Sequence, residues 1–574
     1  MRVKIVILTA LGLIFCSLLS AETSYIKSFL LPPETTRDDV FESSGLNFLE
    51  VQEGFEEVSY DNKYYAATLN DEAINKSLSK DFDSAIELFD EALAYNPFDA
   101  KILNNYLMVM AQKAQMTQNA KDIAFEKRLD EIALRLLAIN PRNIKAALLA
   151  ATIYFNSFNN YKRAAEYLHY AAKFEPNNTQ ITQSLVASLY ATGKYRKTLI
   201  EQAFGHMRKM PQDTQTAVFL VSALFEKNKF YEAEAFLKTS PTRENDPFLA
   251  HAYVRARFSL GKHEGLLEIA QKALRKFPES DNAKSTELII NSLTPKTYLF
   301  TSTLNASLNM ASELEKLTCS LPQINESERQ SISLMEVAVI SRNRRTILKP
   351  IAREDGSLYV DIPRSAWGTK LSIEVLRKIS VKPFFKPQQA PVPDINEIIR
   401  KSGVDLTNRR LEMLYRYVNS LEGDFLINAN RVVNQGLSYY ENRTRYGLDW
   451  IFDNPGKCDC TEYALIFLAL ALKKGMPARL VNGYLIKEEM LGTDDTVGHQ
   501  WLEVYENNRG WVSIDPTLYS TMHLAYHKNM LSTQIIFSVD LEAEQNAFEL
   551  SSLARSDKFD FTVSHSYKFV LLQN

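Results

Sequence analysis

Cysteine is scarce in this sequence of 574 residues, which contains four cysteines. Cys16 lies in an apolar stretch near the start, which leaves Cys319, Cys458 and Cys460 for the rest of the chain. Small secreted domains that depend on disulfides carry an even, closely spaced set instead. The sequence therefore excludes a disulfide framework, and we expect at least one free thiol.

An excess of charge of either sign is also lacking. Lysine and arginine number 66, aspartate and glutamate number 69, and the formal net charge is -3. This balance provides no electrostatic footprint for nucleic acid, so no nucleic-acid partner is predicted. The 45% of apolar residues and 24% of charged residues are typical of a soluble globular protein. A chain of this length is expected to form about three or four domains.

Long apolar runs are absent except at the start of the chain. A basic beginning, an apolar run at residues 5–19 and the small residues Ser20 and Ala21 predict a secretory signal peptide at residues 1–21. We expect secretion across the inner membrane to a periplasmic or extracellular location. No stable membrane span is expected in the mature chain.

Two other interpretations of this N-terminal segment stay open. It could remain as an uncleaved membrane anchor, although its apolar run is shorter than the ~20 residues that span a bilayer. Cys16 could be lipidated, although Phe15 before it is bulkier than the small residue typical of such sites. Cleavage near residue 21 is the preferred prediction.

A period of about 35 residues runs from residue 63 to residue 290. It is marked by prolines 35 residues apart and by small residues at matching separations. These positions are Pro141, Pro176 and Pro211, and the two sets Ala85, Ala92, Pro97 and Ala164, Ala171, Pro176.

The pattern resembles the tetratricopeptide repeat, in which two antiparallel helices per ~34 residues pack small residues where they cross. The resemblance implies an all-α solenoid at residues 63–290 whose concave surface binds a partner protein or peptide. A solenoid that only supports an enzyme is the alternative. The sequence names no partner.

The pattern of apolar residues changes after Pro295, where short apolar runs alternate with polar turns. These runs predict a small β-rich domain at residues 298–382. Four prolines within residues 383–393 predict a linker, because proline interrupts both helices and central strands. Residues 531–574 are predicted to form a C-terminal extension with one strand, to which we assign no chemistry.

Cys460 begins a predicted helix. Ala464, Leu468 and Leu472 make an apolar stripe, and Lys473 to Gly475 followed by Pro477 predict its end. The dipole of a helix favours negative charge at its N-terminus, so this position favours the thiolate that a cysteine nucleophile needs.

Two further residues complete a candidate catalytic set. His499 precedes the alternating residues of a predicted strand, and it is the next downstream candidate for a base. Asp515 closes a second predicted strand before Pro516, and its carboxylate could hold the imidazole through the other ring nitrogen.

Five landmarks occur in order: C-T-E-Y-A, G-M-P-A-R, N-G-Y, G-H-Q-W-L-E-V-Y and G-W-V-S-I-D-P-T. Together they resemble bacterial transglutaminase-like domains, and we place such a domain at residues 394–530. The resemblance implies an α+β papain-like fold with Cys460 as nucleophile, His499 as general base and acid, and Asp515 as the orienting carboxylate. It implies no cofactor.

One position departs from the family, because Cys458 stands where a glycine usually precedes the nucleophile by two residues. Cys458 is thus an alternative nucleophile, but Cys460 stands four residues before Ala464, as the family cysteine does. A disulfide between the two would be strained, and the four ligands of a zinc site are lacking, so no metal is expected. Trp450 and Tyr440 could donate to an oxyanion, but packed aromatic residues are the simpler interpretation.

These features predict a multidomain, exported cysteine enzyme, either a protease or amidase or an acyltransferase. It would act on amide bonds of a protein or peptide substrate through an acyl-enzyme, by hydrolysis or by acyl transfer. The alternative is a repeat-based binding scaffold whose transglutaminase-like domain is inactive.

Overall fold

The computed structural model describes residue 46 and residues 58–116, 122–309, 311–324, 326–327, 329–354, 356–382, 392–441, 444–487, 490–493, 498–507, 510–518, 532–539, 549–554 and 560–573. The predicted signal peptide and most of the predicted linker lie outside these residues. The chain divides into two compact units at residue 250, and the described residues before this boundary form the repeat unit. Those after it form the C-terminal unit.

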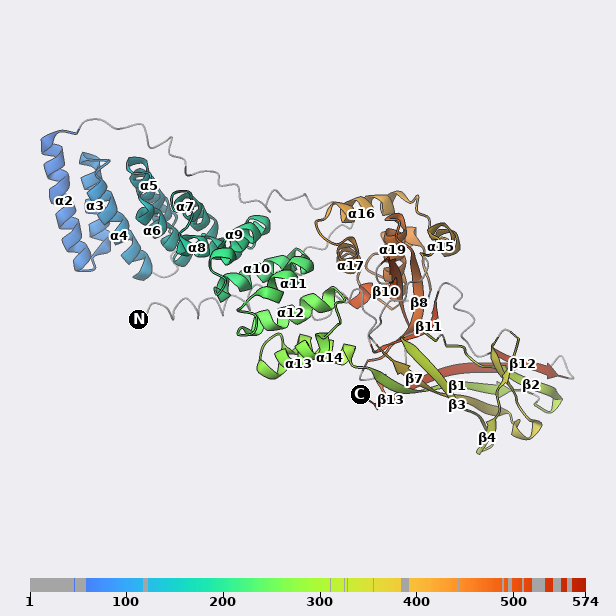
Figure 1. The fold of residues 1–574 in the computed structure, drawn as a ribbon. Helices are drawn as coiled ribbons and strands as arrows, with labels where there is room; N and C mark the ends of the chain where they lie inside the picture. Colours follow the sequence, from blue (N-terminus) through green and yellow to red (C-terminus); the bar gives the residue numbers. More distant parts are fainter. Residues whose placement is uncertain are drawn as a thin grey trace. The chain divides into compact units, whose positions relative to one another are not determined.

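The repeat unit is all helical, which confirms the predicted fold of this region (Figure 1). Each helix packs against the next one along the chain. The first helices of neighbouring hairpins are also in contact, for example α2 with α4 and α4 with α6. The helices are α2 (Tyr60–Leu78), α3 (Phe82–Tyr95), α4 (Ala100–Met116), α5 (Ile123–Ile139), α6 (Ile144–Asn156), α7 (Tyr161–Phe174), α8 (Thr179–Ala191), α9 (Arg196–Lys209), α10 (Thr214–Glu226) and α11 (Phe230–Thr239).

Small residues and caps explain these hairpins. The repeated alanines Ala85, Ala92, Ala164 and Ala171 are all fully buried, which lets neighbouring helices approach closely. Asn and Asp side chains cap most of the helix starts, for example Asp213 at α10, where it accepts hydrogen bonds from backbone N–H groups of the first turn. The periodic residues of the sequence are therefore the packing and capping residues of the helices.

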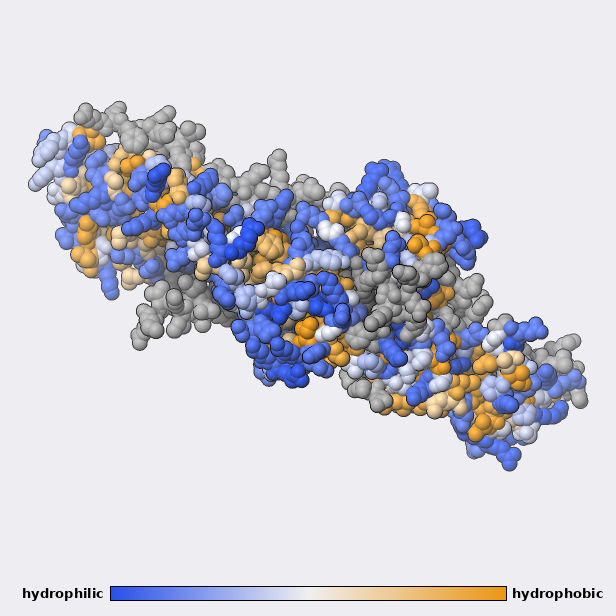
Figure 2. Space-filling model, in the orientation of Figure 1, coloured by the Kyte–Doolittle hydropathy of each residue, from blue (hydrophilic) through white to orange (hydrophobic). Residues whose placement is uncertain are grey.

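The C-terminal unit begins with three helices, α12 (Pro247–Ser259), α13 (Leu266–Lys276) and α14 (Ala283–Leu293), of which α12 starts just before the boundary. A β domain follows, with two antiparallel sheets ordered β13-β1-β7-β3-β4 and β12-β2-β6-β5. Its strands are β1 (Lys296–Leu308), β2 (Leu314–Ser320), β3 (Gln330–Ser341), β4 (Arg344–Leu348), β5 (Ile351–Ala352), β6 (Leu358–Asp361), β7 (Lys370–Val381), β12 (Glu549–Ala554) and β13 (Phe561–Gln573). Figure 2 shows that apolar and hydrophilic residues are interspersed on the visible face of this domain.

The last part of the unit is an α+β domain, as predicted. Its sheet has the order β10-β9-β8-β11. The elements are α15 (Ile395–Ser402), α16 (Arg409–Ser420), α17 (Phe425–Gly436), α18 (Leu448–Asp453), α19 (Cys460–Lys473), β8 (Ala478–Leu485), β9 (Gly498–Glu506), β10 (Gly510–Ile514), the short 3-10 helix η8 (Pro516–Leu518) and β11 (Gln534–Val539). The predicted extension at residues 531–574 thus contributes β11 to this sheet, and β12 and β13 to the β domain.

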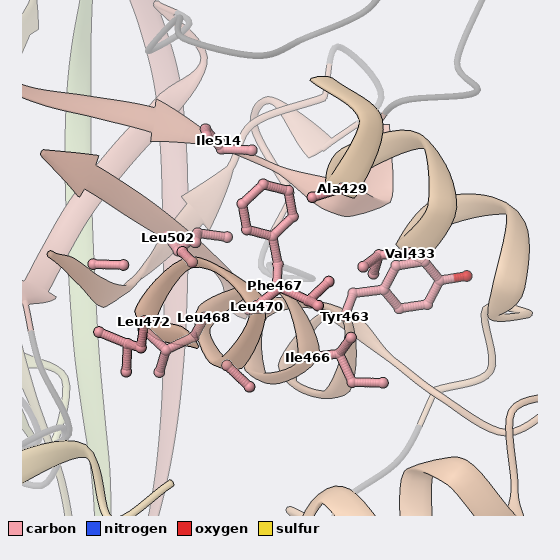
Figure 3. Packing of buried hydrophobic residues seen from close by; sticks show 14 of the residues in the cluster. Ala429, Val433, Tyr463, Ile466, Phe467, Leu468, Leu470, Leu472, Leu502 and Ile514 are labelled. Carbon is pink, nitrogen blue, oxygen red and sulfur yellow. The ribbon is translucent and has the colours of Figure 1, made fainter. Parts of the chain in front are cut away.

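Helix α19 is the centre of the α+β domain. Phe467, fully buried, points from this helix toward Ile514 of β10 and Ala429 of α17 (Figure 3). Leu502 of β9 joins the same core. The apolar side of α19 therefore fixes the helix, with its first residue Cys460, against the sheet.

Strand β1 takes part in two separate cores. Leu304 packs between the two sheets of the β domain, whereas Phe300 packs against the sheet of the α+β domain. The buried Arg377 lies between Val375 of the first core and Ile379 of the second, and it donates hydrogen bonds to the carbonyl of Pro322 and to a serine hydroxyl. Burial lowers the pKa of Arg377 to about 10. Because one strand spans both cores, the β domain and the α+β domain are packed as one body.

Candidate active site

Cys460 is the first residue of α19, and its side chain is buried. The preceding Asp459 caps the helix by accepting a hydrogen bond from the backbone N–H of Thr461 at 2.8 Å. Glu462 accepts one from the backbone N–H of Asp459 at 2.8 Å, which completes a capping box. The free N–H groups of a first turn favour negative charge nearby, so this position suits a thiolate.

Glu462 is a buried residue that the sequence reasoning missed. Its carboxyl group also accepts hydrogen bonds from the hydroxyl of Thr461 at 2.9 Å and from the backbone N–H of Tyr446 at 3.4 Å. Burial raises the pKa of Glu462. The spacing D-x-x-E before an apolar run is a sequence signal for such a capping box and could have identified it.

His499 lies on β9, directly opposite Gly483 of β8. A Cβ atom on Gly483 would stand 1.9 Å from the carbonyl oxygen of Ile535 on β11 and 2.8 Å from the ring of Trp501. Only glycine permits this close approach of β8 and β11 beside the histidine.

Asp515 follows β10 and is almost fully buried. Its Oδ2 atom lies 2.6 Å from Nε2 of His499 and accepts a longer hydrogen bond, of 3.4 Å, from Nε2 of Gln534. Its Oδ1 atom accepts hydrogen bonds from the backbone N–H of Thr517 at 3.1 Å and from the hydroxyl of Thr517 at 2.6 Å. Both oxygens of the carboxylate are thus held by protein donors.

The imidazole of His499 is placed between this carboxylate and the candidate nucleophile. Burial by itself would lower the pKa of His499, but the charge and hydrogen bond of Asp515, together with the hydrogen bond and charge of Cys460, raise it to about 10. Nε2 faces Asp515, so Nδ1 is the ring nitrogen left for the thiol. The structure therefore brings the three residues together, while their catalytic roles stay a prediction.

The sequence around these three residues is similar to that of known proteins. Residues 415–516, which include all three side chains, match the sequence model of the Transglutaminase-like superfamily. The chain carries a transglutaminase-like domain. A curated relative, the uncharacterized protein YebA of Bacillus subtilis (strain 168), is 26% identical over 161 residues, a match of 25% of this chain and 21% of that protein. The match therefore spans about one fifth of the length of that relative.

Several solved structures match this chain at low sequence identity. A candidate cysteine protease from Cytophaga hutchinsonii is 12% identical with a TM-score of 0.29, and covers 48% of this chain and 98% of its own. YrrB, a tetratricopeptide repeat protein with an unusual peptide-binding site, is 16% identical with a TM-score of 0.27, and covers 35% and 97%. PilF of Pseudomonas aeruginosa is 12% identical with a TM-score of 0.24, and covers 40% and 99%.

Cys458 lies two residues before Cys460, but its environment differs from that of Cys460. Its side chain is fully buried, and its Sγ donates a hydrogen bond to the carbonyl of Asn454 at 3.4 Å. Burial, followed by the charge of Glu462, raises the pKa of Cys458 to about 12. A thiol with this pKa stays protonated near neutral pH, which disfavours Cys458 as the nucleophile.

The segment before α18 runs beside the chain that leads to Cys460. Tyr439 forms a parallel bridge with Cys458, and the N–H of Tyr440 donates to the carbonyl of Cys458 at 2.8 Å. The side chain of Tyr440 is exposed, and Trp450 stacks on Tyr446 with ring centroids 3.5 Å apart. Burial raises the pKa of the Tyr439 hydroxyl, and the charge of Cys460 raises it further. Tyr439, which the sequence reasoning did not single out, therefore lies near the thiol of Cys460.

None of the helices in the described ranges combines the length and the apolar character that a bilayer crossing requires.

Proposed function

We propose that this chain is an exported thiol enzyme that acts on amide bonds of a protein or peptide substrate through an acyl-enzyme. The observation that carries the proposal is a single buried arrangement, with Cys460 at the start of α19 beside an imidazole that Asp515 holds at 2.6 Å. A carboxylate, an imidazole and a thiol in this order supply an orienting group, a base and a nucleophile.

The chemistry follows from these three groups. The thiolate of Cys460 attacks the carbonyl carbon, and the backbone N–H at the helix start offers a donor to the oxyanion. The imidazolium of His499 then gives its proton to the leaving amine, and a thioester remains on the sulfur. Water attacks the thioester for hydrolysis, or an amine attacks it for acyl transfer, and His499 takes up the proton of the attacking group.

We further propose that the repeat unit binds the substrate or a partner protein, and that the predicted signal peptide directs the chain across the inner membrane. The repeat fold supports the first suggestion, since stacked helical repeats present extended binding surfaces. N-terminal sequencing of the purified mature protein tests the second, with a start near residue 22 as the expected result and a start at Met1 as the contrary one.

An electrophilic thiol probe separates this function from that of an inactive binding scaffold. The wild-type chain should be labelled at Cys460 near neutral pH, and Cys460→Ala should not. Mass spectrometry of envelope proteins from cells with wild-type or Cys460→Ala chains then distinguishes cleaved from crosslinked products. Unlabelled Cys460 in the folded wild-type chain, with unchanged envelope proteins, would favour the scaffold.

A further inference from the structure

The carboxylate of Asp515 is hydrogen-bonded to a residue of β11, and β11 is hydrogen-bonded to the β domain. Gln534 lies at the start of β11, is buried, and donates to Oδ2 of Asp515, the oxygen that also faces His499. Its amide must present nitrogen to this oxygen, because two facing acceptors would repel each other. Gln534 therefore meets the candidate site at the carboxylate of Asp515.

Strand β11 is fastened by a second buried glutamine, from the β domain. Gln330 of β3 is fully buried, its Nε2 donates to the carbonyl of Ile536 at 2.7 Å, and its Oε1 accepts from the N–H of Ile536 at 2.9 Å. The pairing of β11 with β8 is irregular between Ile536 and Ser538, so Gln330 binds the strand beside its irregular part. Two antiparallel hydrogen bonds to one residue fix both its position and its orientation.

Ser532, just before β11, is also held by hydrogen bonds. The hydroxyl of Tyr298 on β1 donates to the carbonyl of Ser532 at 3.0 Å, and the N–H of Ser532 donates to the carbonyl of Ser292 in α14 at 3.0 Å. Tyr298 is buried. Strand β11 is therefore anchored on both sides of Gln534 by residues outside the transglutaminase-like match.

We infer that the β domain positions the catalytic carboxylate, because Gln330 holds β11 and β11 presents Gln534 to Asp515. Gln534 and Gln330 are positioning residues, and the inference rests on the proposed function. A buried side chain that is held by a second hydrogen-bonded residue keeps its orientation, which an orienting carboxylate requires. Without the donor of Gln534, the carboxylate of Asp515 should lose its orientation toward His499. The imidazolium form of His499, which stabilises the thiolate, then becomes less favourable than the neutral imidazole.

The test measures the alkylation rate of Cys460 in the full chain by iodoacetamide, resolved by peptide mass spectrometry, and needs no substrate. The readout is the rate at about pH 6 divided by the rate at about pH 10, because the thiolate at low pH depends on the imidazolium. Gln534→Met, which keeps the length of the side chain but removes the donor, should lower this ratio about ten-fold. Gln330→Met should lower it about three-fold or more.

Val339→Ala is the matched control, because Val339 is fully buried in the other core of the β domain, whose described members include no residue of β11. It should lower the melting temperature and leave the alkylation ratio unchanged. Gln330→Met combined with Gln534→Met should lower the ratio by less than the product of the single effects, since both act through one carboxylate.

Ratios within two-fold of wild type in both glutamine variants would overturn the inference. If Gln534→Met does not fold, the ratio in Gln330→Met decides. A failure of the proposed function looks different, because His499→Ala would then leave the wild-type ratio unchanged.

Discussion

The described residues include a largely buried histidine–aspartate pair in each of the two units. In the repeat unit, Nε2 of His206 on α9 lies 2.8 Å from Oδ2 of Asp213. In the C-terminal unit, Nε2 of His499 lies 2.6 Å from Oδ2 of Asp515. The pairs differ in their surroundings, since Nδ1 of His206 is buried without a hydrogen-bond partner, whereas His499 has Cys460 as a neighbour that raises its pKa.

The carboxylates of Asp213 and Asp515 also differ in the groups that they bind. Asp213 caps α10 by accepting from the backbone N–H groups of Gln215 and Thr216, which explains its place without any chemistry. Asp515 caps no long helix and is oriented by the side chains of Thr517 and Gln534. A histidine–aspartate contact by itself therefore does not define a site, and the adjoining thiol makes the difference.

The largest effect should come from breaking the C-terminal set itself. Cys460→Ala and His499→Ala should each lower turnover by about a thousand-fold or more, because nucleophile and base act as one unit. His206→Ala, the matched change in the repeat unit, should keep turnover and lower only the melting temperature. Turnover of a peptide substrate and labelling of Cys460 are the measurements, and an equal loss in His206→Ala would remove the distinction between the pairs.

The second effect concerns the two aspartates. Asp515→Asn should lower kcat/KM by about a hundred- to ten-thousand-fold and leave some activity, because the imidazole loses its orientation but thiol and base remain. Asp213→Asn should keep full activity, since asparagine caps a helix about as well as aspartate. Steady-state kinetics together with circular dichroism decide between these outcomes, and wild-type kcat/KM in Asp515→Asn would contradict the assignment.

The sequence predicted the elements whose signal is local. The proline period and the small alanines gave the helical repeats, and the apolar stripe after Cys460 gave α19 with the thiol at its start. These features depend on spacings within one or two turns of helix, which the sequence displays directly.

Contacts between residues far apart in the sequence could not be predicted from such local patterns. Gln534 meets Asp515, and Gln330 meets Ile536 across 206 residues, yet no local pattern marks either glutamine. The return of β13 to pair with β1, with Phe569 opposite Phe300, is equally non-local. Strand pairing of this kind depends on the packing of the whole unit, so a single sequence shows which residues can form strands but not their partners.

The third prediction uses pH. Asp515 and Cys460 raise the folded-state pKa of His499 to about 10, against an ordinary value of about 6.5. The protonated pair therefore stabilises the fold fully below about pH 6.5, and this contribution declines as the pH rises and is lost through about pH 10. Thermal unfolding from pH 6 to pH 10 should show this fall in wild type and a smaller fall in Asp515→Asn. Parallel curves for the two proteins would contradict it.

The smallest effect should come from the other thiol of the same segment. Cys458→Ser should keep turnover within about two-fold and change the free energy of unfolding by about 1 kcal/mol or less, since serine can still donate to the carbonyl of Asn454. Burial raises the pKa of Cys458 to about 12, so its thiol should resist labelling until the protein unfolds.

Two reciprocal variants make this last comparison decisive. In the folded protein, Cys458→Ser should be labelled at Cys460 at the wild-type rate, and Cys460→Ala should show no labelling at Cys458. After unfolding, Cys458 in the second variant should react like any free thiol, which proves that the probe can reach it. The two thiols are separated by one residue, and of the two Cys460 is the one that starts a helix and raises the pKa of His499. Labelling of Cys458 in folded Cys460→Ala, together with turnover lost in Cys458→Ser, would move the nucleophile to Cys458, because reactivity follows the thiolate rather than the position in the motif.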